Sequence, residues 1–424
     1  MKGWRGLAAG AAALAVAVSG CGTSTNSGGG TETKEITVWL MDGSAPTTLT
    51  DALNKEFESA NGIKVKYEVQ KWGGIQEKLT TALASSTPPD VIELGNTQTA
   101  SFADQGTLMD LTADAKQFNE AEYLGGLKDS LTLNGKQYGV PFYAANRTVI
   151  YRTDLFQAAG IAQPPTSRAE WLDAINKLKA ANASNPDFQA LYLPGQSWYF
   201  LLSLLWDEGG DVAKQDGGKW QGALNTAQAK AGFEAYKALY DASATKKAPA
   251  DTDEAKPQQM EVFGTGNVGM MIGLPWELAG AVKAKPDLAT KTAAFPIPSK
   301  KAGSTAPVFL GGSNLAIPAA SKNSAAAKKY LALLSSKKYQ EQLAEGGAVP
   351  GTSKDTAKLA TTPLGKAMAT SSQNGKVTPV TPKWAAVEAG QNPLKDALTA
   401  YLSGAKSLDQ ATKDASEAVT KAMK

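Results

Sequence analysis

The alternation of strand and helix patterns between residues 35 and 95 limits the fold of this chain more than any other feature. The predicted elements in this stretch are a strand at 35–41, a helix at 48–61, a strand at 63–70, a helix at 75–83 and a strand at 91–94. This order predicts a βαβαβ unit, in which right-handed crossovers make the strands parallel. The loops after the first and third strands, around Asp42 and Asn96, should therefore lie along one edge of the sheet, where ligand contacts are expected.

A second series of elements after Pro141 is predicted to repeat this architecture. Its members are a strand at 148–151, a helix patterned by Trp171, Ile175 and Leu178, a turn at 194–199, an apolar helix at 200–206 and a strand at 268–272. The turn contains Trp198 and Tyr199, and Trp276 follows the last strand. The sequence thus predicts an α/β protein built from two halves, each with its own sheet.

The N-terminal residues have the arrangement of a bacterial lipoprotein signal. Lys2 and Arg5 give a basic start, residues 7–18 are apolar, and small residues precede the single cysteine, Cys21. We predict a signal peptide over 1–20 and a diacyl lipid on Cys21 that would anchor the protein at a membrane surface. An ordinary secretory signal with an incidental cysteine is the alternative. Residues 21–34, rich in Gly, Ser and Thr, are expected to form a flexible tether.

Composition excludes several classes of function. The chain has 0 histidines and 1 cysteine, so a Ser/His/Asp or Cys/His nucleophile and the commonest zinc sites are excluded. Without Lys2 and Arg5 the formal charge of the remaining chain is close to neutral. Nucleic-acid binding depends largely on basic side chains that neutralise phosphates, so no nucleic-acid partner is expected. No cofactor or metal is predicted.

Several segments along nearly the whole chain carry a resemblance to one family. They are the opening strand with Trp39, the step at 89–92, the segments 135–141 and 154–156, the turn at 263–270 that leads to 275–277, and the stretch 311–314. Together they resemble the extracellular solute-binding proteins of ABC importers, in the sugar-binding family that includes the maltose-binding protein. The resemblance implies a two-lobe, periplasmic-binding-protein-like fold with a ligand cleft between the lobes, which closes about a hinge.

The resemblance also implies the extent of each lobe. Residues 35–143 and 314–345 would form the N-terminal lobe, and residues 149–308 and 352–424 the C-terminal lobe. Three segments would cross between them, near Tyr143–Arg147, Phe309–Asn314 and Gly346–Thr352.

Sugar binding needs flat aromatic surfaces for the C–H face of the ring and side chains that both donate and accept hydrogen bonds. By the family pattern, Tyr199, Trp276 and Trp384 supply stacking surfaces, with Trp198 beside Tyr199; packing in the core is the alternative for each. Trp384 is expected in an irregular stretch that starts at Gly375. The polar and backbone candidates at loops and crossings are Asp42, Ser44, Asn96, Gln98, Tyr143, Asn146, Arg147, Glu277, Gly312, Ser313 and Asn314. For Arg147, a salt bridge to a nearby carboxylate is the alternative.

Two short motifs resemble a dinucleotide-binding motif and a calcium-binding loop. Residues 264–269 spell GxGxxG, but a strand is expected to follow them, whereas a dinucleotide site needs a strand before and a helix after. Residues 251–254 resemble the start of a calcium loop but lack its glycine and its closing glutamate, so we interpret them as a solvated loop.

The leading hypothesis is a non-catalytic binding lipoprotein on the outer face of the cytoplasmic membrane. It would capture a mono- or oligosaccharide and deliver it to the permease subunits of an ABC importer, acting as a monomer. A secreted glycoside hydrolase with a carboxyl pair such as Asp42 and Glu277 is one alternative. A binding protein for a non-sugar solute and a structural envelope lipoprotein are the others.

Overall fold

The strands predicted within residues 35–95 form one side of the largest sheet. In the computed structural model, which describes residues 33–389 and 391–424, β1 (Glu35–Met41) pairs in parallel with both β2 (Lys64–Gln70) and β3 (Val91–Gly95). The connecting helices are α1 (Thr47–Asn61) and α2 (Ile75–Leu83). Gly62 ends α1 with φ of 65°, a left-handed conformation that glycine adopts without a steric penalty. The predicted βαβαβ unit is confirmed.

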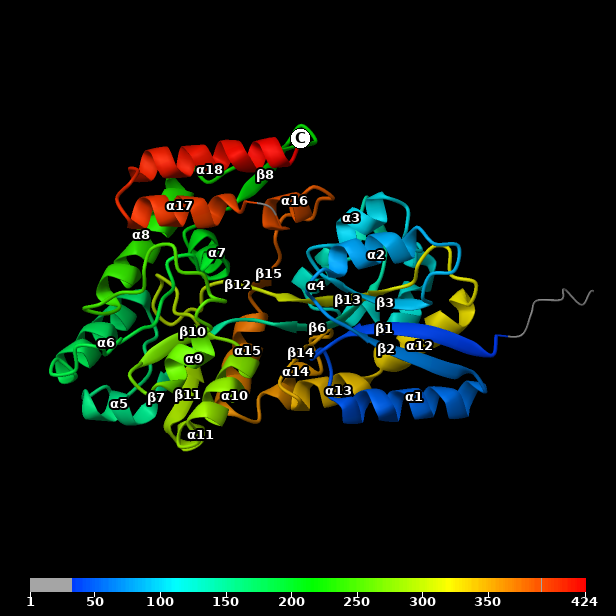
Figure 1. The fold of residues 1–424 in the computed structure, drawn as a ribbon, viewed down its shortest axis with the longest axis horizontal. Helices are drawn as coiled ribbons and strands as arrows, with labels where there is room; N and C mark the ends of the chain where they lie inside the picture. The colour runs from blue at the N-terminus through cyan, green and yellow to red at the C-terminus, as the bar shows by residue number, and fades with distance from the viewer. Residues whose placement is uncertain (1–32, 390) are drawn as a thin grey trace, which may run out of the picture. The chain divides into compact units, whose positions relative to one another are not determined.

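Three later strands complete this sheet, whose order is β14-β6-β13-β3-β1-β2. The added strands are β6 (Val140–Ala145), β13 (Gly311–Ala316) and β14 (Val349–Pro350), and β13 pairs antiparallel with both β3 and β6. Gly312 permits the close approach of β13 to β6, because a Cβ there would lie 2.1 Å from the carbonyl oxygen of Tyr143. In Figure 1, β6 and β13 run from this sheet toward the second group of elements.

Alternating side chains of β1 face two separate apolar layers. Ile36, Val38 and Leu40 pack with α1, α12 (Ser324–Leu334) and α13 (Lys337–Glu345). Trp39 and Met41 belong to the layer that contains α2. The remaining elements of this part are α3 (Thr99–Asp104), η1 (Thr112–Phe118), η2 (Glu120–Glu122), α4 (Gly125–Ser130), β4 (Thr132–Leu133) and β5 (Lys136–Gln137).

The second sheet has β7 (Thr148–Arg152) at its centre, between β10 (Met270–Gly273) and β11 (Thr292–Phe295). Both partners run antiparallel to β7. The prediction that the second half repeats the parallel architecture of the first is therefore wrong in its strand directions. Two isolated parallel bridges, Gln189 to Val268 and Tyr192 to Met271, are present beside this sheet. Chain segments that alternate between strand and helix do not by themselves fix strand direction.

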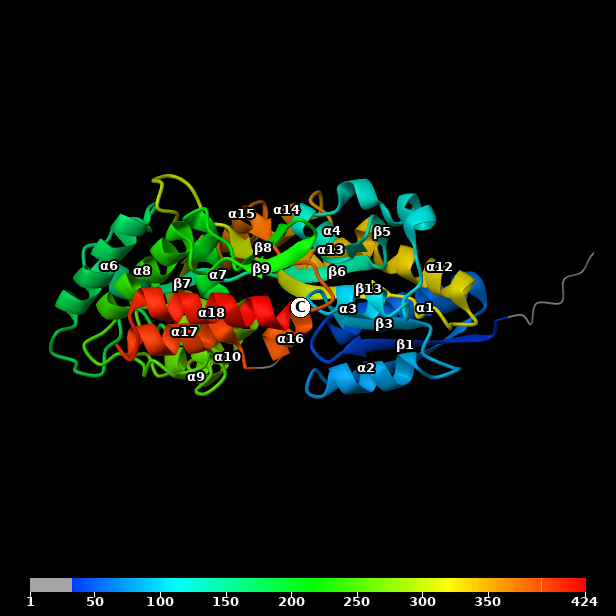
Figure 2. The ribbon, with the colours of Figure 1, turned by 90° about the horizontal axis from the view of Figure 1, so that it is seen from above.

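The helices of this half build two apolar clusters. They are α5 (Thr153–Ala158), α6 (Arg168–Ala181), α7 (Trp198–Asp207), α8 (Ala227–Ala242), α9 (Gln259–Gly264), α10 (Pro275–Ala284), α11 (Leu288–Lys291), α15 (Pro363–Ser372), α16 (Trp384–Ala389), α17 (Pro393–Leu402) and α18 (Leu408–Ala422). Figure 2 shows α16 beside the adjacent helices α17 and α18. The last elements are β8 (Ala213–Asp216), β9 (Lys219–Gly222), β12 (Val308–Phe309), α14 (Thr356–Leu359) and β15 (Gly375–Lys376).

Two local predictions are wrong. Trp198 and Tyr199 do not lie in a turn, because α7 already begins at Trp198 after Ser197. The prediction that Trp384 lies in an irregular stretch also fails, since α16 begins there. Each helix starts directly after a turn that contains Pro together with Ser or Thr. Because these residues favour turns, the sequence pattern did not indicate the first helical residues.

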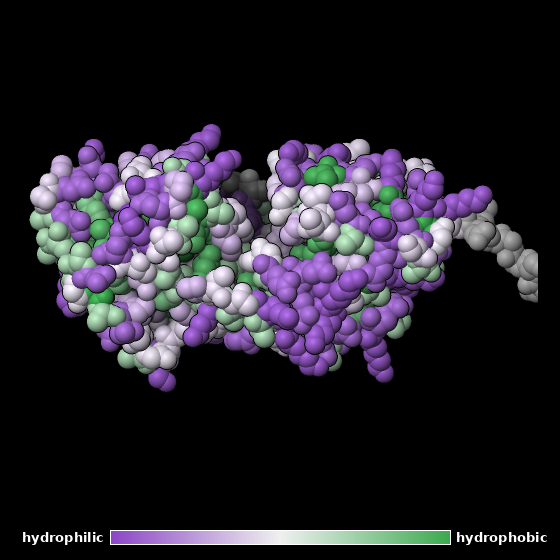
Figure 3. Space-filling view, turned by 90° about the horizontal axis from the view of Figure 1, so that it is seen from below, coloured by the Kyte–Doolittle hydropathy of each residue, from purple (hydrophilic) through white to green (hydrophobic). Residues whose placement is uncertain are grey.

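Residues Lys34–Lys424 form one structural unit. Figure 3 shows a face of it on which hydrophilic residues predominate and apolar residues occur as scattered patches. Within the described residues, we find no helix with both the length and the apolar character needed to cross a membrane. The predicted signal peptide, most of the tether and Cys21 lie outside the described residues.

Candidate functional site

A continuous groove lies where loops of the first sheet meet elements of the second. One part is a cavity of about 520 Å³ between the loop 42–47, Tyr143, and the segment around Pro275 and Trp276. The other is a cavity of about 340 Å³ lined by residues 95–98, Trp72, Tyr199 and Glu388, among others. The two cavities share Tyr143, Ala145 and Trp276. The groove therefore collects side chains from the carboxyl ends of β1 and β3 and from α7, α10 and α16.

Aromatic side chains supply the flat surfaces of the groove. Trp72 and Trp276 are 41% and 57% exposed, an unusual degree for such large apolar side chains. Trp72 lies in the loop before α2, and Trp276 lies in the first turn of α10. Both line the smaller cavity, together with Tyr199 and Phe309, which stack on each other at 4.8 Å with an interplanar angle of 10°. The exposed rings of Trp72 and Trp276 can cover the apolar face of a cyclic ligand.

Tyr199 is held by contacts on several sides. Its hydroxyl is hydrogen-bonded to Glu388, whose other carboxylate oxygen accepts a bond from Trp384 Nε1 at 3.1 Å. Its ring stacks on Trp198 at 3.8 Å, and the guanidinium of Arg147 lies 4.8 Å from its centre. Burial, and then the charge of Glu388, raise the pKa of Tyr199 well above its ordinary value. The phenol therefore stays protonated and donates to Glu388.

A buried carboxylate supports the other side of the groove. Glu93 on β3 is 0% exposed and accepts hydrogen bonds from Met41 N–H (2.7 Å), the Ser44 hydroxyl (2.6 Å) and the Ser313 hydroxyl (2.5 Å). The Ser44 hydroxyl also lies 3.2 Å from that of Tyr143, and both residues line the larger cavity. Burial raises the pKa of Glu93 to about 7, although the three donors oppose the shift. Sequence analysis did not single out Glu93, because a lone glutamate in an apolar strand gives no signal.

Arg147 forms an ion pair with Glu254, and both side chains are largely buried. The hydroxyl of Ser197 bonds the same carboxylate, so Glu254 links the first crossing to the start of α7. The alternative of a structural salt bridge for Arg147 is thus realised. The interpretation of 251–254 as a solvated loop is wrong for Glu254, which no short-range pattern identifies as the partner of a residue 107 positions away.

The predicted site residues divide into two sets. Those that line the groove are Asp42, Ser44, Asn96, Gln98, Tyr143, Tyr199, Trp276 and Gly312. Those that line neither cavity are Asn146, Arg147, Trp198, Glu277, Ser313, Asn314 and Trp384. In the second set, Trp384 is 1% exposed, and Ser313 and Asn314 are 0% exposed. Groove residues that the sequence analysis missed are Trp72, Thr97, Phe309 and Glu388.

Several residues of the second set have evident structural contacts. Glu277 accepts a hydrogen bond from Leu274 N–H at 2.8 Å at the start of its own helix. Asn314 donates to the hydroxyls of Thr99 and Ser130. Asn146 is 0% exposed, and neither of its amide atoms has a hydrogen-bond partner within the part of the chain that the structure describes.

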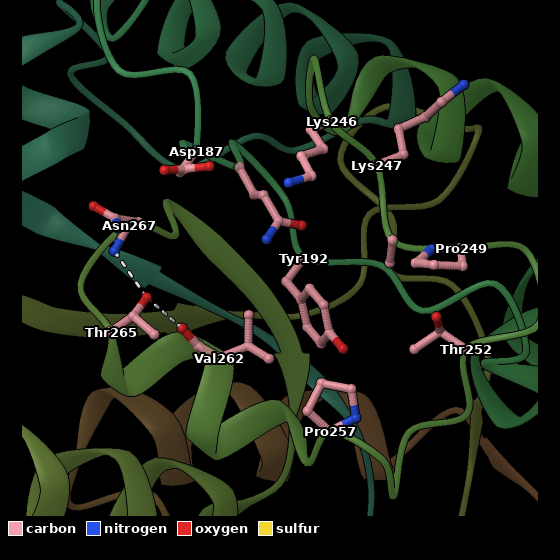
Figure 4. A pocket seen from close by; sticks show the side chains of 12 residues that line it. Asp187, Tyr192, Lys246, Lys247, Pro249, Thr252, Pro257, Val262, Thr265 and Asn267 are labelled. Atoms are coloured by element: carbon pink, nitrogen blue, oxygen red, sulfur yellow. Dashed lines mark hydrogen bonds between the residues drawn. The ribbon is translucent and has the colours of Figure 1, made fainter.

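A separate hollow of about 380 Å³ lies beside β10 (Figure 4). It is lined by Tyr192, Lys246, Thr252 and Asn267, among others, and none of the predicted site residues reaches it. Tyr192 is 3% exposed and its hydroxyl is buried, so the hollow offers no exposed aromatic face. The groove is therefore the better candidate for a cyclic ligand.

The structure shows the surroundings of the two motifs set aside in the sequence. Residues 264–269 run from the end of α9 to β10, so a strand follows the glycines, as expected. Among residues 33–389 and 391–424, no group of three or more Cys, Asp or Glu side chains could hold a metal ion. The two carboxylates considered for hydrolysis have different surroundings. Asp42 lines the groove, whereas Glu277 caps the start of α10.

Two sheets that share a groove at their facing loops define a two-lobe binding protein. The model of the family described as bacterial extracellular solute-binding protein matches residues 42–341. The diacetylchitobiose binding protein DasA of Streptomyces coelicolor is 41% identical over 377 residues, which cover 89% of this chain and 87% of that protein. The lactose-binding protein of Rhizobium radiobacter is 26% identical, with 74% of each chain covered.

The solved structure of the sugar-binding protein MalE from Xanthomonas citri superposes with a TM-score of 0.80, at 24% identity and over 92% of this chain and 97% of that one. This likeness shows the fold, and the predicted two-lobe α/β fold is confirmed. The chain belongs to the bacterial extracellular solute-binding proteins. The family and these relatives are binding proteins rather than enzymes, and the family is extracellular.

Proposed function

We propose that this protein is the saccharide-binding component of an ABC importer and that it captures its ligand in the groove. The observation that carries the proposal is the pair of exposed rings, Trp72 and Trp276, which line one cavity from the loop before α2 and from the first turn of α10. Asp42, Gln98 and Tyr143 add hydrogen-bonding groups along the same groove. This combination of flat apolar surface and polar rim matches a sugar ring with its hydroxyl groups.

Diacetylchitobiose is the first candidate ligand. Its support is the 41% identity to a relative named for binding it, over most of both chains. A disaccharide also suits the arrangement of two connected cavities, since each ring can occupy one of them. The other saccharides to compare are N-acetylglucosamine, lactose and maltose.

The lobes in this proposal are residues 35–143 with 314–345 and residues 149–308 with 352–424. The first sheet and the three crossing segments support this division, because β6, β13 and β14 lie side by side where the chain passes between the two sheets. Closure of the lobes over the ligand would bring Trp72 and Trp276 together.

We further propose that the protein works outside the cytoplasmic membrane, anchored through a lipid on Cys21, and passes its ligand to permease subunits as a monomer. The signal-like residues 1–20 support this proposal. Mass spectrometry of the membrane-associated protein would test it, because a diacyl modification on Cys21 is expected and an unmodified thiol would contradict the anchor.

The decisive experiment is isothermal titration of the purified protein against diacetylchitobiose and the other saccharides, with amino acids as the comparison. Saturable binding of at least one saccharide is expected, weakened by Trp276→Ala. Binding of an amino acid with no response to any saccharide would overturn the proposal. Chromatography after long incubation should recover the bound sugar intact, whereas continued release of monosaccharide would indicate a hydrolase.

A further inference from the structure

We propose that Glu93 is a positioning residue that sets the direction of hydrogen bonding in the groove, so that saccharide binds more tightly when Glu93 is protonated. The proposal rests on the proposed function. Glu93 itself lines neither cavity. It acts through Ser44 and Tyr143, which line the larger one.

The geometry of the carboxyl group fixes where a proton would reside. Oε2 accepts from the backbone N–H of Met41, which can only donate. Oε1 faces the hydroxyls of Ser44 and Ser313, each of which can donate or accept. A proton on Glu93 therefore lies on Oε1 and is donated to a serine.

The two protonation states give the groove opposite polarity. When Glu93 is ionised, Ser44 and Ser313 both donate their single hydrogens to Oε1, so in a hydrogen bond with either serine Tyr143 is the donor and offers its lone pairs to a ligand. When Glu93 is protonated, the carboxylic acid donates to one of the two serines, that serine is free to donate to Tyr143, and the phenol hydrogen turns toward the groove. The only change in composition is one proton taken up from solvent.

Both states are accessible near neutral pH because burial raises the pKa of Glu93 to about 7. The titratable groups packed around it are Tyr143 on β6 and Tyr67 on β2. Burial raises the pKa of each phenol, and the negative charge of Glu93 acts in the same direction. After β1, Asp42 is paired with Lys71 at 2.6 Å. No ion pair to Glu93 occurs in the described residues, so no fixed positive charge holds it ionised.

The direction of the effect follows from the chemistry of the groove. Its carboxylates, Asp42 and Glu388, are acceptors when ionised. A disaccharide presents atoms that only accept, namely the ring and glycosidic oxygens and, in an N-acetylated sugar, the amide carbonyl. An extra donor from Tyr143 therefore complements the ligand better than an extra acceptor.

The test is isothermal titration with diacetylchitobiose from pH 5.5 to 8.5, repeated in buffers of different ionisation enthalpy. For the unmodified protein, Kd should rise roughly three- to tenfold with pH, the range that one hydrogen bond supplies, and binding near pH 7 should take up protons. Glu93→Gln, whose amide donates at every pH, should bind at all pH values about as tightly as the unmodified protein does at pH 5.5. Glu417→Gln, an exposed control, should keep the original pH profile.

Two variants that retain Glu93 test whether it acts through the hydrogen-bond chain of Ser44 and Tyr143 or only by supporting the structure. Ser44→Ala and Tyr143→Phe should both abolish the pH dependence and bind more weakly at pH 5.5. A Kd independent of pH in the unmodified protein, tighter binding at high pH, or an unchanged pH profile in Glu93→Gln would each overturn the inference while leaving the proposed function intact. Absence of saccharide binding at every pH would overturn the proposed function and this inference with it.

Discussion

Replacing Glu93 by glutamine should remove a pH-dependent loss of stability. The pKa of Glu93 is about 7 in the folded protein and 4.5 in its ordinary state. Each pKa unit corresponds to about 1.4 kcal/mol, so the shift amounts to about 3 kcal/mol. Because the folded-state pKa is the higher one, the unfolded chain releases the proton first as pH rises. The free energy of unfolding therefore falls between pH 4.5 and pH 7 and is flat above that window.

Urea unfolding at half-unit steps from pH 4 to 8 measures this effect. The free energy of unfolding of the unmodified protein minus that of Glu93→Gln should fall by about 3 kcal/mol across the window. Burial also raises the pKa of Glu277, but that contribution is common to both proteins and cancels. Glu417→Gln, at an exposed position of α18, should leave the pH dependence unchanged. A difference between the two proteins that stays constant with pH would refute a protonated, buried Glu93.

Three further predictions concern the groove and its supports. Trp276→Ala should weaken saccharide binding about tenfold, because a ligand that covers about 60 Å² of the exposed ring gains about 1.5 kcal/mol, as titration would show. Arg147→Met should lower the free energy of unfolding in urea by about 3 kcal/mol, since Glu254 would be left without its partner. Gly312→Ala should cost more than about 2 kcal/mol in the same assay, because its Cβ would meet the Tyr143 carbonyl at 2.1 Å.

Each of these predictions has a matched control. Val69→Ala removes another exposed apolar side chain, outside the groove, and should leave Kd unchanged. Adding Glu254→Gln to Arg147→Met should recover part of the lost stability; full additivity would mean that the pair does not interact. Gly73→Ala, where an added Cβ meets nothing within 4 Å, should be tolerated, and equal losses at both glycines would contradict the steric argument.

The fold was predictable where local patterns decide it. The alternation of polar and apolar residues in β2 and the helical spacing of Leu49, Leu53 and Phe57 identify their elements without tertiary information. The direction of β10 against β7 was not predictable in this way, because strand direction depends on the path of the connections. The start of α7 at Trp198 was missed for a related reason, since a turn signal and a helix N-terminus share the same residues.

The site was predictable to the extent that it lies at the ends of strands. Asp42, Ser44, Asn96 and Gln98 were found because parallel strands bring their carboxyl ends to one edge. Trp384 was predicted as an aromatic stacking surface, but its side chain is buried. Its Nε1 donates a hydrogen bond to Glu388, which lines the groove. Exposure, which distinguishes a stacking surface from a core residue, is a tertiary property that sequence does not display.

The carboxylates that support the groove were missed because their chemistry depends on burial. In the sequence, Glu93 is a single polar residue within an apolar strand, and Glu254 belongs to an acidic segment that is typical of a solvated loop. In the fold, desolvation makes the first a proton acceptor near neutral pH and gives the second a buried cationic partner. A buried charge persists only where it is paired or can neutralise itself by binding a proton. Glu254 has the buried Arg147 as its partner, whereas Glu93 has hydroxyl and N–H partners, so a proton on Glu93 is what would change the hydrogen bonding of the groove near neutral pH.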